Sequence, residues 1–322
     1  MADNPILDAV FHAWRLSVIT TACRLGVFTR LEGDRLSAEQ LARELSCVPH
    51  LLEAVLDACA ALGLLRRQDG HYTNRHLSSA YLVEGRPLYL GHILEVQARG
   101  AARWQQLLDV VRTGEPPAVP GEAGEQDAIF TLAMNDLGAH NEAAALAEAV
   151  DLRECSTLLD VGCGSGLYGI TLCRHNPHLT ATLIDRAPVL HTTEKMIAAS
   201  GVGDRIRTRV GDMTGDDFGQ DVDAILLSDA LYQDAAVCKR ILRSVHTALR
   251  PGGTVVVRGY YPDPGDSEPL FGAIFRLNLL LFEPQRTPPT ANDIAQHLAH
   301  VGFVAVRRFA LTERSLCFVG TK

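Results

Sequence analysis

The chain has 322 residues, of which 47% are apolar and 21% are charged. That is too long for one ordinary domain and enough for two domains with substantial cores, so the composition excludes a disordered protein. The formal net charge of −8 and the pI near 5.8 argue against a general nucleic-acid binder, which needs a basic surface facing the phosphates.

The cysteines and the apolar segments bear on the cellular compartment. The eight cysteines are scattered without a C-x-x-C pair, so we expect reduced thiols rather than disulfides or a zinc site. The first residues carry acids where a secretory signal would be basic, and Arg276 interrupts the most apolar stretch, residues 271–282. We therefore expect a cytoplasmic protein without a bound metal ion and without a membrane or nucleic-acid partner.

The amino-terminal third has a helical pattern followed by a hairpin. Residues 5–31 are predicted to form one long helix, whose apolar side chains spread beyond a single face and so indicate two burial partners, one of them a second subunit. Short helices are predicted over residues 37–45 and 49–63, and a hairpin over residues 64–73. This order is typical of a winged helix.

A winged helix can bind DNA or serve as a dimerisation and substrate-lid module. In the first case the helix after Pro49 would enter the major groove. Its first turns carry His50, Glu53 and Asp57 and no Lys or Arg. Acidic side chains repel phosphates, so the pattern favours the dimerisation module.

The middle of the chain connects two patterns. A helix running to about residue 112 carries Arg103 and Trp104, and a Gly/Pro-rich loop follows over residues 113–124. A helical stretch is predicted over residues 127–150.

After residue 150, short apolar runs alternate with helical segments. This alternation predicts a parallel sheet with helical crossovers. The expected strands are residues 157–161, 180–184, 206–210, 222–227 and 254–258, with a closing pair near 303–309 and 316–320.

A glycine-rich turn follows the first of these strands, in the sequence LLDVGCGSG over residues 158–166. Such glycines let the backbone approach a ligand closely, and the next helix supplies free N–H groups. The spacing G-x-G-x-G differs from the dinucleotide fingerprint G-x-G-x-x-G because residue 167 is Leu, and no Gly-Lys-Ser/Thr follows as in a phosphate-binding P-loop.

Two carboxylates follow the next two strands. Asp185 stands about twenty residues beyond the glycine turn, where a carboxylate binds the two hydroxyls of a ribose. Asp212 offers a carboxylate for an adenine amino group, and Met213 an apolar side chain for its ring face. The glycine turn lacks basic residues for a phosphate. A ligand with a ribose and an adenine but no phosphate is implied, and S-adenosylmethionine (SAM) fits that description.

These motifs resemble those of the SAM-dependent O-methyltransferases of the acetylserotonin, caffeate and bacterial natural-product type. The resemblance implies an α/β fold: a class I methyltransferase Rossmann-like sheet preceded by an α-helical winged-helix dimerisation domain. It also implies an intertwined homodimer and a small-molecule acceptor. Besides the winged-helix region, it rests on residues 104–116, 130–134, 158–166, 211–213 and 249–253.

Site residues and domains follow from the same resemblance. Met134 would approach the junction between cofactor and acceptor. Independently of the resemblance, Arg103 is a candidate to reach a carboxylate of the acceptor, and Trp104 is a further candidate acceptor-binding residue. The implied cofactor-binding residues are Gly162, Gly164, Asp185, Asp212, Met213 and Ser228. The implied domains are a dimerisation domain, a linker with connecting helices and a SAM-binding domain, over residues 1–110, 111–150 and 151–322.

The chain departs from the family at the catalytic base. Hydroxyl-methylating members place a His-Asp pair after the fourth strand, and here those positions hold Tyr232 and Gln233. Arg258 replaces the Glu that often ends the fifth strand, and the supporting acid expected within residues 287–290 is missing. The base and its partners are thus lost together, which makes Tyr232 and Arg258 the candidate catalytic residues.

Several readings of these two residues stay open. A Tyr with an ordinary pKa near 10 is a poor base. A neighbouring Arg258 would lower the pKa of Tyr232, or it would bind an anionic substrate. Alternatively, Arg258 forms a structural ion pair with Asp229 or Asp234. Tyr232 in turn is either a catalytic group or a packing residue at the pocket wall.

We expect a SAM-dependent methyltransferase that acts on oxygen, nitrogen or carbon of a small molecule without the family's His base. An amine, a thiolate, a stabilised carbanion or an acidic phenol needs little help from a base, because positioning supplies much of the rate. One alternative keeps the cofactor but uses its sulfonium in decarboxylation, hydroxylation or a pericyclic step. Another is a winged-helix regulatory protein.

Overall fold

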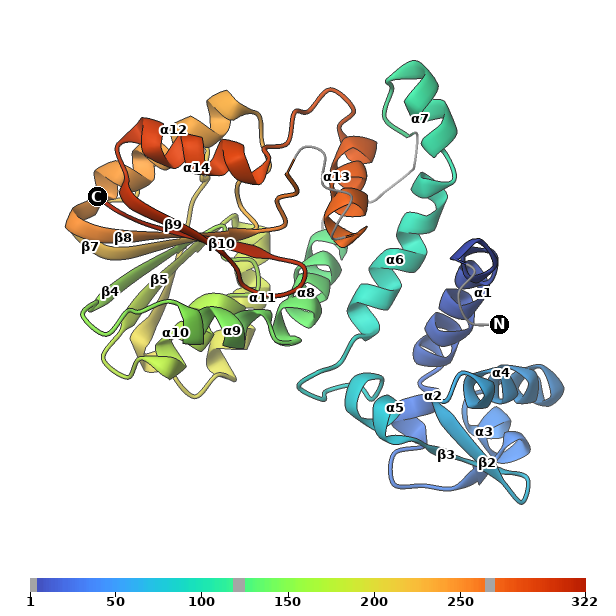
Figure 1. Ribbon diagram of the computed structural model, residues 1–322. Helices are drawn as coiled ribbons and strands as arrows, with labels where there is room; N and C mark the ends of the chain where they lie inside the picture. Colours follow the sequence, from blue (N-terminus) through green and yellow to red (C-terminus); the bar gives the residue numbers. More distant parts are fainter. Residues whose placement is uncertain (1–4, 118–124, 264–269) are drawn as a thin grey trace. The chain divides into compact units, whose positions relative to one another are not determined.

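The computed structural model describes residues 5–117, 125–263 and 270–322, and its contacts divide the chain into two units between Ala101 and Ala102 (Figure 1). Part of the predicted Gly/Pro-rich loop, residues 118–124, lies outside the described residues. Residues 125–150, part of the predicted linker region, group with the second unit.

The first unit consists of helices and a small antiparallel sheet in the order β1-β3-β2. Its elements are α1 (Pro5–Arg24), α2 (Val27–Arg30), β1 (Leu36–Ser37), α3 (Ala38–Glu44), α4 (Pro49–Ala61), β2 (Leu65–Gln68), β3 (His71–Asn74) and α5 (His76–Tyr81); α6 (Gly91–Trp104) crosses the division.

Local sequence signals explain most of these boundaries. The capping box that begins α3 is formed by Ser37 and Gln40, and Pro49 is the first residue of α4, both as predicted. The single helix predicted over residues 5–31 is wrong, because Gly26 adopts a φ of 74° and separates α1 from α2.

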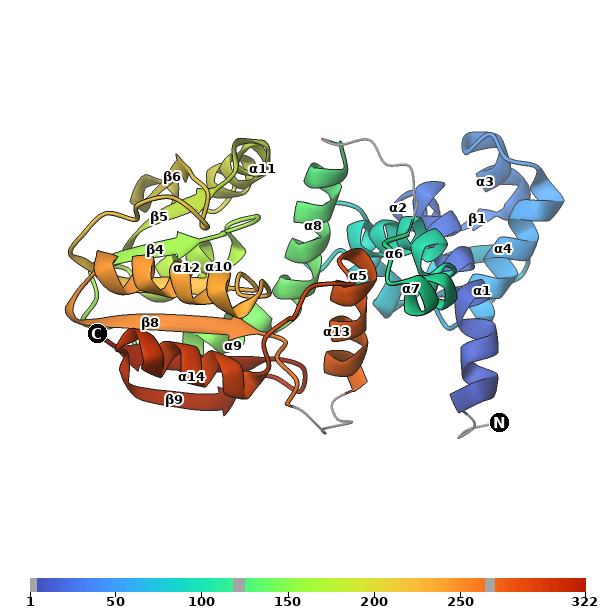
Figure 2. The same cartoon turned by 90° about the horizontal axis from the view of Figure 1, so that it is seen from above.

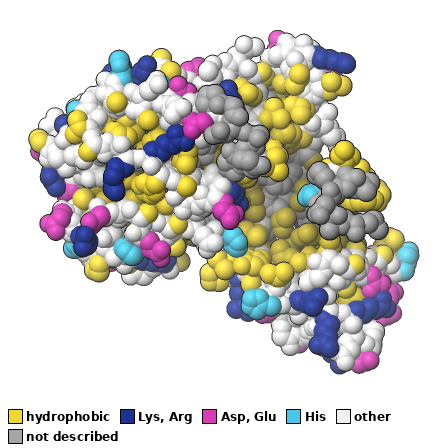
Figure 3. All heavy atoms as spheres, in the orientation of Figure 1, with side chains coloured by type: hydrophobic (Ala, Val, Ile, Leu, Met, Phe, Trp, Pro, Cys, Tyr) yellow, Lys and Arg dark blue, Asp and Glu magenta, His cyan; other side chains and the backbone are white. Residues whose placement is uncertain are grey.

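The acids of α4 are paired within the first unit. Arg67 of β2 binds Glu53 at 2.7 Å and Asp57 at 2.6 Å, and Tyr72 donates a hydrogen bond to Asp57 at 2.7 Å. Lys and Arg side chains are interspersed with Asp and Glu over the face drawn in Figure 3. Helix α4 itself carries these two acids and no Lys or Arg, whereas a DNA-reading helix needs cations.

The second unit is a seven-stranded sheet with helices on both faces. Its elements are α7 (Leu107–Thr113), α8 (Glu125–Ala139), α9 (Glu142–Ala149), β4 (Thr157–Val161), α10 (Leu167–His175), β5 (Thr180–Asp185), α11 (Ala187–Ala198), the 3₁₀ turn η1 (Gly203–Arg205), β6 (Ile206–Val210), β7 (Val222–Ser228), α12 (Ala235–Ala248), β8 (Leu249–Gly259), α13 (Leu270–Phe282), α14 (Ala291–Val301), β9 (Val304–Ala310) and β10 (Leu316–Thr321).

The strand order is β6-β5-β4-β7-β8-β10-β9, in which the first five strands are parallel and β10 is antiparallel to β8 and β9. All seven predicted strands are confirmed, although β8 begins at Leu249 rather than at Thr254. The helix predicted over residues 127–150 is in fact two helices, because Asn141 has a φ of 86° between α8 and α9.

Two apolar layers enclose the sheet. Helices α12 and α14 cover one face and α9, α10 and α11 the other (Figure 1, Figure 2). Successive residues of β4 alternate between the layers, with Leu159 and Val161 in the first and Leu158 in the second. Within the described ranges, no helix has the length and apolar character needed to span a bilayer.

Candidate active site

Four adjacent strands, β6, β5, β4 and β7, carry the predicted cofactor residues at or just after their carboxyl ends. Asp212 follows β6, Asp185 ends β5, Gly162 follows β4 and Ser228 ends β7. The carboxyl ends of parallel strands meet at one edge of a sheet, which is where α/β proteins bind ligands. The structure thus brings these residues of separate sequence segments to one edge.

The glycine turn is held against β5. The N–H groups of Gly162 and Cys163 donate to the Ile184 carbonyl at 2.9 and 3.1 Å, and the Gly164 N–H donates to Asp185 Oδ2 at 2.9 Å. Gly162, Gly164 and Gly166 have φ values of 74°, 55° and 79°. Side chains other than glycine rarely adopt these values, so the turn needs glycines for its conformation.

The Asp185 carboxylate is oriented by two backbone donors. Besides the Gly164 N–H, the Arg186 N–H donates to its Oδ1 at 2.8 Å. The side chain of Asp185 is therefore held at the turn.

The segment after β6 lies against the same turn. A Cβ placed on Gly162 would be 3.7 Å from Met213 Cε and 3.5 Å from Ala230 Cβ. Asp212 accepts hydrogen bonds from the backbone and side chain of Thr214, both at 2.8 Å, and these donors hold its pKa below the usual range. Asp212 is therefore a fixed carboxylate next to an apolar side chain.

A second carboxylate lies beneath the turn. Asp160 of β4 is 1% exposed and accepts a hydrogen bond from the Gly169 N–H at 3.2 Å, while its Oδ1 has no partner among the described residues. Burial raises the pKa of Asp160 to about 7, and the nearby charge of Asp185 adds to this effect.

Tyr232, the predicted replacement for the family's His, is enclosed in the second unit. Its hydroxyl donates to Asp229 Oδ1 at 2.6 Å and accepts from the Tyr260 N–H at 2.8 Å. Burial, with the charge of Asp229 as a second cause, raises the pKa of Tyr232 well above 10. The phenol is therefore neutral at physiological pH.

Arg258 is fully enclosed and forms a buried ionic cluster with two acids. Its Nη2 binds Glu142 Oε2 of α9 at 2.7 Å, and its Nη1 binds Asp229 Oδ2. The guanidinium also lies 4.3 Å from the ring centre of Tyr260 and 5.5 Å from that of Tyr168. Of the readings left open by the sequence, this geometry matches the structural ion pair with Asp229.

Glu142 and Asp229 are the residues of this cluster that were not singled out as site residues from the sequence. Glu142 lies 116 positions before Arg258, and no motif marks it. Asp229 follows β7 directly and has a φ of 52°, which is unusual for a residue other than glycine and frequent at functional sites. Its side chain is 34% exposed, whereas that of Arg258 is 0% exposed.

The predicted acceptor residues lie on α6 and α8. Met134 of α8 is 38% exposed. Arg103, at the end of α6, places its guanidinium 4.8 Å from the ring centre of Phe282 in α13, and Trp104 is half-buried beside it. The roles of these three residues toward an acceptor stay predictions.

Aromatic rings surround the Tyr232 position. Phe275 of α13 lies 5.2 Å from the ring centres of both Tyr232 and Tyr260, and Phe271 lies 4.8 Å from that of Tyr260. Tyr261 contacts Tyr232 at 5.3 Å. Helix α13 therefore covers the end of β8 with an apolar, aromatic layer.

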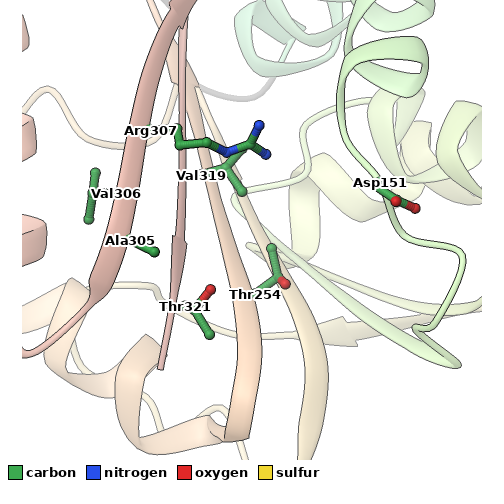
Figure 4. Close-up of a pocket in the computed structure, with 7 residues that line it drawn as sticks. All are labelled: Asp151, Thr254, Ala305, Val306, Arg307, Val319 and Thr321. Atoms are coloured by element: carbon green, nitrogen blue, oxygen red, sulfur yellow. The ribbon is translucent and has the colours of Figure 1, made fainter.

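A separate surface pocket of about 470 Å³ lies between β8, β9 and β10, with Arg307 and Asp151 on opposite sides (Figure 4). It includes Thr254 and Thr321, which pair at the end of the sheet remote from the glycine turn, and none of the candidate site residues lines it. Within the described ranges, no group of three His, Cys, Asp or Glu side chains is arranged to hold a metal ion.

Family models match both parts of the chain. An O-methyltransferase domain matches residues 117–304, more than half of the sequence, and an O-methyltransferase dimerisation domain matches residues 7–84. These matches agree with the resemblance found in the motifs.

Three similar proteins extend this result. The 3-hydroxy-5-methyl-1-naphthoate 3-O-methyltransferase of Streptomyces sahachiroi is 33% identical over 86% of this chain and 82% of its own, and the N,N-dimethyltransferase OxyT of Streptomyces rimosus is 26% identical over 92% and 89%. The structure of human N-acetylserotonin methyltransferase in complex with SAM superposes with a TM-score of 0.88 at 22% identity, over 100% of this chain and 99% of that one. The chain therefore belongs to the O-methyltransferase family: it is a SAM-dependent methyltransferase with the class I fold and an N-terminal dimerisation domain.

Proposed function

We propose that this enzyme methylates a small molecule in natural-product biosynthesis without a side-chain general base at the family's His position. The observation that carries this proposal is the state of Tyr232. Its hydroxyl both donates and accepts a buried hydrogen bond, and its pKa is raised, so it neither binds a further proton nor yields its own near neutral pH.

In this proposal Arg258 is also held in place by its neighbours. With its side chain 0% exposed and ion-paired to Glu142 and Asp229, it holds Asp229 and, through it, the Tyr232 hydroxyl. Both predicted catalytic residues then act as positioning residues, because their polar atoms are used within the fold.

The chemistry of the strand ends fits SAM. Asp185 would hold the ribose hydroxyls, and Asp212 and Met213 the adenine, as the sequence predicts. Gly164 leaves open space, since a Cβ placed there would meet nothing within 4 Å, and the buried Ser228 hydroxyl has no partner among the described residues. When bound, SAM supplies an activated methyl group, and these residues fix its orientation toward the acceptor.

An acceptor that is already nucleophilic suits such a site. Of the relatives above, one is named for methylation of a hydroxyl and one for methylation of an amine, so the fold accommodates both. In-line attack on a sulfonium methyl group depends mainly on proximity and alignment once the nucleophile is available. The aromatic layer of α13 supports an acceptor with an aromatic or apolar body.

The test is turnover with methyl-labelled SAM and a set of small aromatic acceptors, measured for the wild type and for Tyr232→Phe. We expect label in the product, and a kcat for the variant within about tenfold of the wild type, because a lost general base costs about 10²-fold or more. Product without label would instead support the non-methylating chemistries. A loss of 10²-fold with an unchanged dissociation constant for SAM would make Tyr232 a catalytic acid or base and overturn the proposal.

We also propose that the enzyme is a homodimer through its N-terminal unit. The dimerisation-domain match covers α1, on which Val10, Phe11 and Trp14 are 56%, 43% and 67% exposed. The rings of Phe11 and Trp14 are in contact, and a contiguous exposed apolar patch of this kind marks a protein–protein contact surface. Trp14→Glu is expected to convert the dimer to a monomer in size-exclusion chromatography with light scattering, and a monomeric wild type would contradict the proposal.

A further inference from the structure

The buried ionic cluster carries one unbalanced charge. The carboxylates of Glu142 and Asp229 face the single guanidinium of Arg258. Glu142 is saturated, because it also accepts hydrogen bonds from Thr312 at 2.7 Å and Ser315 at 2.5 Å. Burial opposes its charge, but Arg258 and these hydroxyls hold the pKa of Glu142 below its usual range.

Of the two carboxylates, that of Asp229 is the one that a further cation can reach from solvent. This side chain is 34% exposed, while the side chains of its cluster partners Glu142 and Arg258 are 0% exposed. Although part of the side chain reaches solvent, desolvation by the surrounding protein raises the pKa of the Asp229 carboxyl more than Arg258 lowers it, so a further cation would stabilise its charged form. The adjacent Ser228 hydroxyl, 9% exposed, has no partner among the described residues.

Asp229 lies next to the cofactor turn. It precedes Ala230, whose Cβ is 3.5 Å from the position of a Cβ on Gly162, and it follows β7, the strand beside β4. The ring of Tyr232, which hydrogen-bonds to Asp229, packs on Phe275. An accessible carboxylate beside aromatic rings is suited to a cation.

We propose that Asp229 is the counter-ion of the methyl transfer and selects a neutral nitrogen nucleophile on an aromatic or apolar acceptor. This rests on the proposed function, in which the nucleophile needs no base. The nitrogen lone pair forms a C–N bond while the C–S bond breaks and its electron pair stays on sulfur. The positive charge passes from the sulfonium to the acceptor nitrogen, which then releases its N–H proton to solvent, and S-adenosylhomocysteine remains.

Charge is what distinguishes the acceptors. With an amine the positive charge is kept throughout the transfer, so a fixed carboxylate stabilises the reactant, the transition state and the product cation alike. With a phenolate the nucleophile is itself an anion, and Asp229 repels it. The site therefore disfavours phenolate acceptors.

The decisive experiment compares the binding of SAM and of neutral S-adenosylhomocysteine by calorimetry. Asp229→Asn keeps the side-chain size and removes the charge. The affinity for SAM is therefore expected to fall about tenfold more than the affinity for S-adenosylhomocysteine. Asp204→Asn, at an exposed acid on η1, is the matched control and should leave the ratio of the SAM and S-adenosylhomocysteine affinities unchanged. An unchanged ratio in Asp229→Asn overturns the proposal.

Two measurements keep the proposal testable should Asp229→Asn fail to fold. The wild type is expected to bind sinefungin, which carries an ammonium near the sulfonium position, about five- to tenfold tighter than S-adenosylhomocysteine, and equal affinities overturn the proposal. With labelled SAM, 2-naphthylamine should be methylated faster than 2-naphthol, and the reverse order also overturns it. If Tyr232→Phe lowers turnover but keeps the wild-type ratio of SAM to S-adenosylhomocysteine affinity, the proposed function is overturned and the role of Asp229 is not.

Discussion

Removal of the Tyr232 hydroxyl separates a structural role from a catalytic one. Tyr232→Phe loses the 2.6 Å hydrogen bond to the Asp229 carboxylate and leaves the Tyr260 N–H, bonded at 2.8 Å in the wild type, without its partner. A hydrogen bond to a charged group contributes about 1.5–3 kcal/mol, and a buried unsatisfied N–H costs about 1–3 kcal/mol. We therefore expect a loss of about 3–5 kcal/mol in unfolding free energy.

The assay is thermal unfolding together with labelled methyl transfer. For a unit of this size the loss corresponds to a fall of about 10 °C in apparent Tm, while kcat stays within about tenfold of the wild type. Tyr72→Phe is the matched control, because Tyr72 donates a comparable hydrogen bond to Asp57 at 2.7 Å in the first unit. An unchanged Tm with a kcat reduced 10²-fold would refute the reasoning.

Three further predictions concern the glycine turn, the acid beneath it and the ionic cluster. Gly166→Ala should destabilise the fold, because Gly166 has a φ of 79° and a Cβ there would lie 2.8 Å from the Leu183 side chain. Gly164→Ala should fold, since its Cβ meets nothing within 4 Å, and should bind SAM more weakly in calorimetry. Asp160 has a folded pKa of about 7, above its unfolded value near 3.9, so its contribution to stability is full below about pH 4 and is lost as the pH rises to 7. Asp160→Asn should remove this loss, up to about 4 kcal/mol between pH 4 and pH 8 in urea unfolding, and parallel pH profiles for the two proteins would contradict it. Arg258→Met should lower the unfolding free energy by about 3–5 kcal/mol or prevent folding, since it leaves two carboxylates without their cation. Arg153→Met, which removes a side chain that is 81% exposed, should leave the unfolding free energy nearly unchanged.

Local patterns were sufficient to predict the sheet and the glycine-rich turn at its edge. The apolar runs of β4 to β8 and the glycines after β4 follow from rules that act within a few residues. The two helix breaks were missed, at Gly26 and Asn141, because apolar periodicity continues through both positions while the backbone adopts a positive φ.

The sequence by itself determined the family, the parallel sheet and the cofactor class, and it predicts that Tyr232 and Arg258 replace the family's His and Glu. Only the tertiary structure decided how these two side chains are held. The pairing of Glu142 with Arg258 joins residues 116 positions apart, and the burial that raises the pKa of Tyr232 comes from α13 and the strand ends together. Charge balance and desolvation are properties of neighbours in space, so the unbalanced charge of this cluster emerges only when the chain is folded.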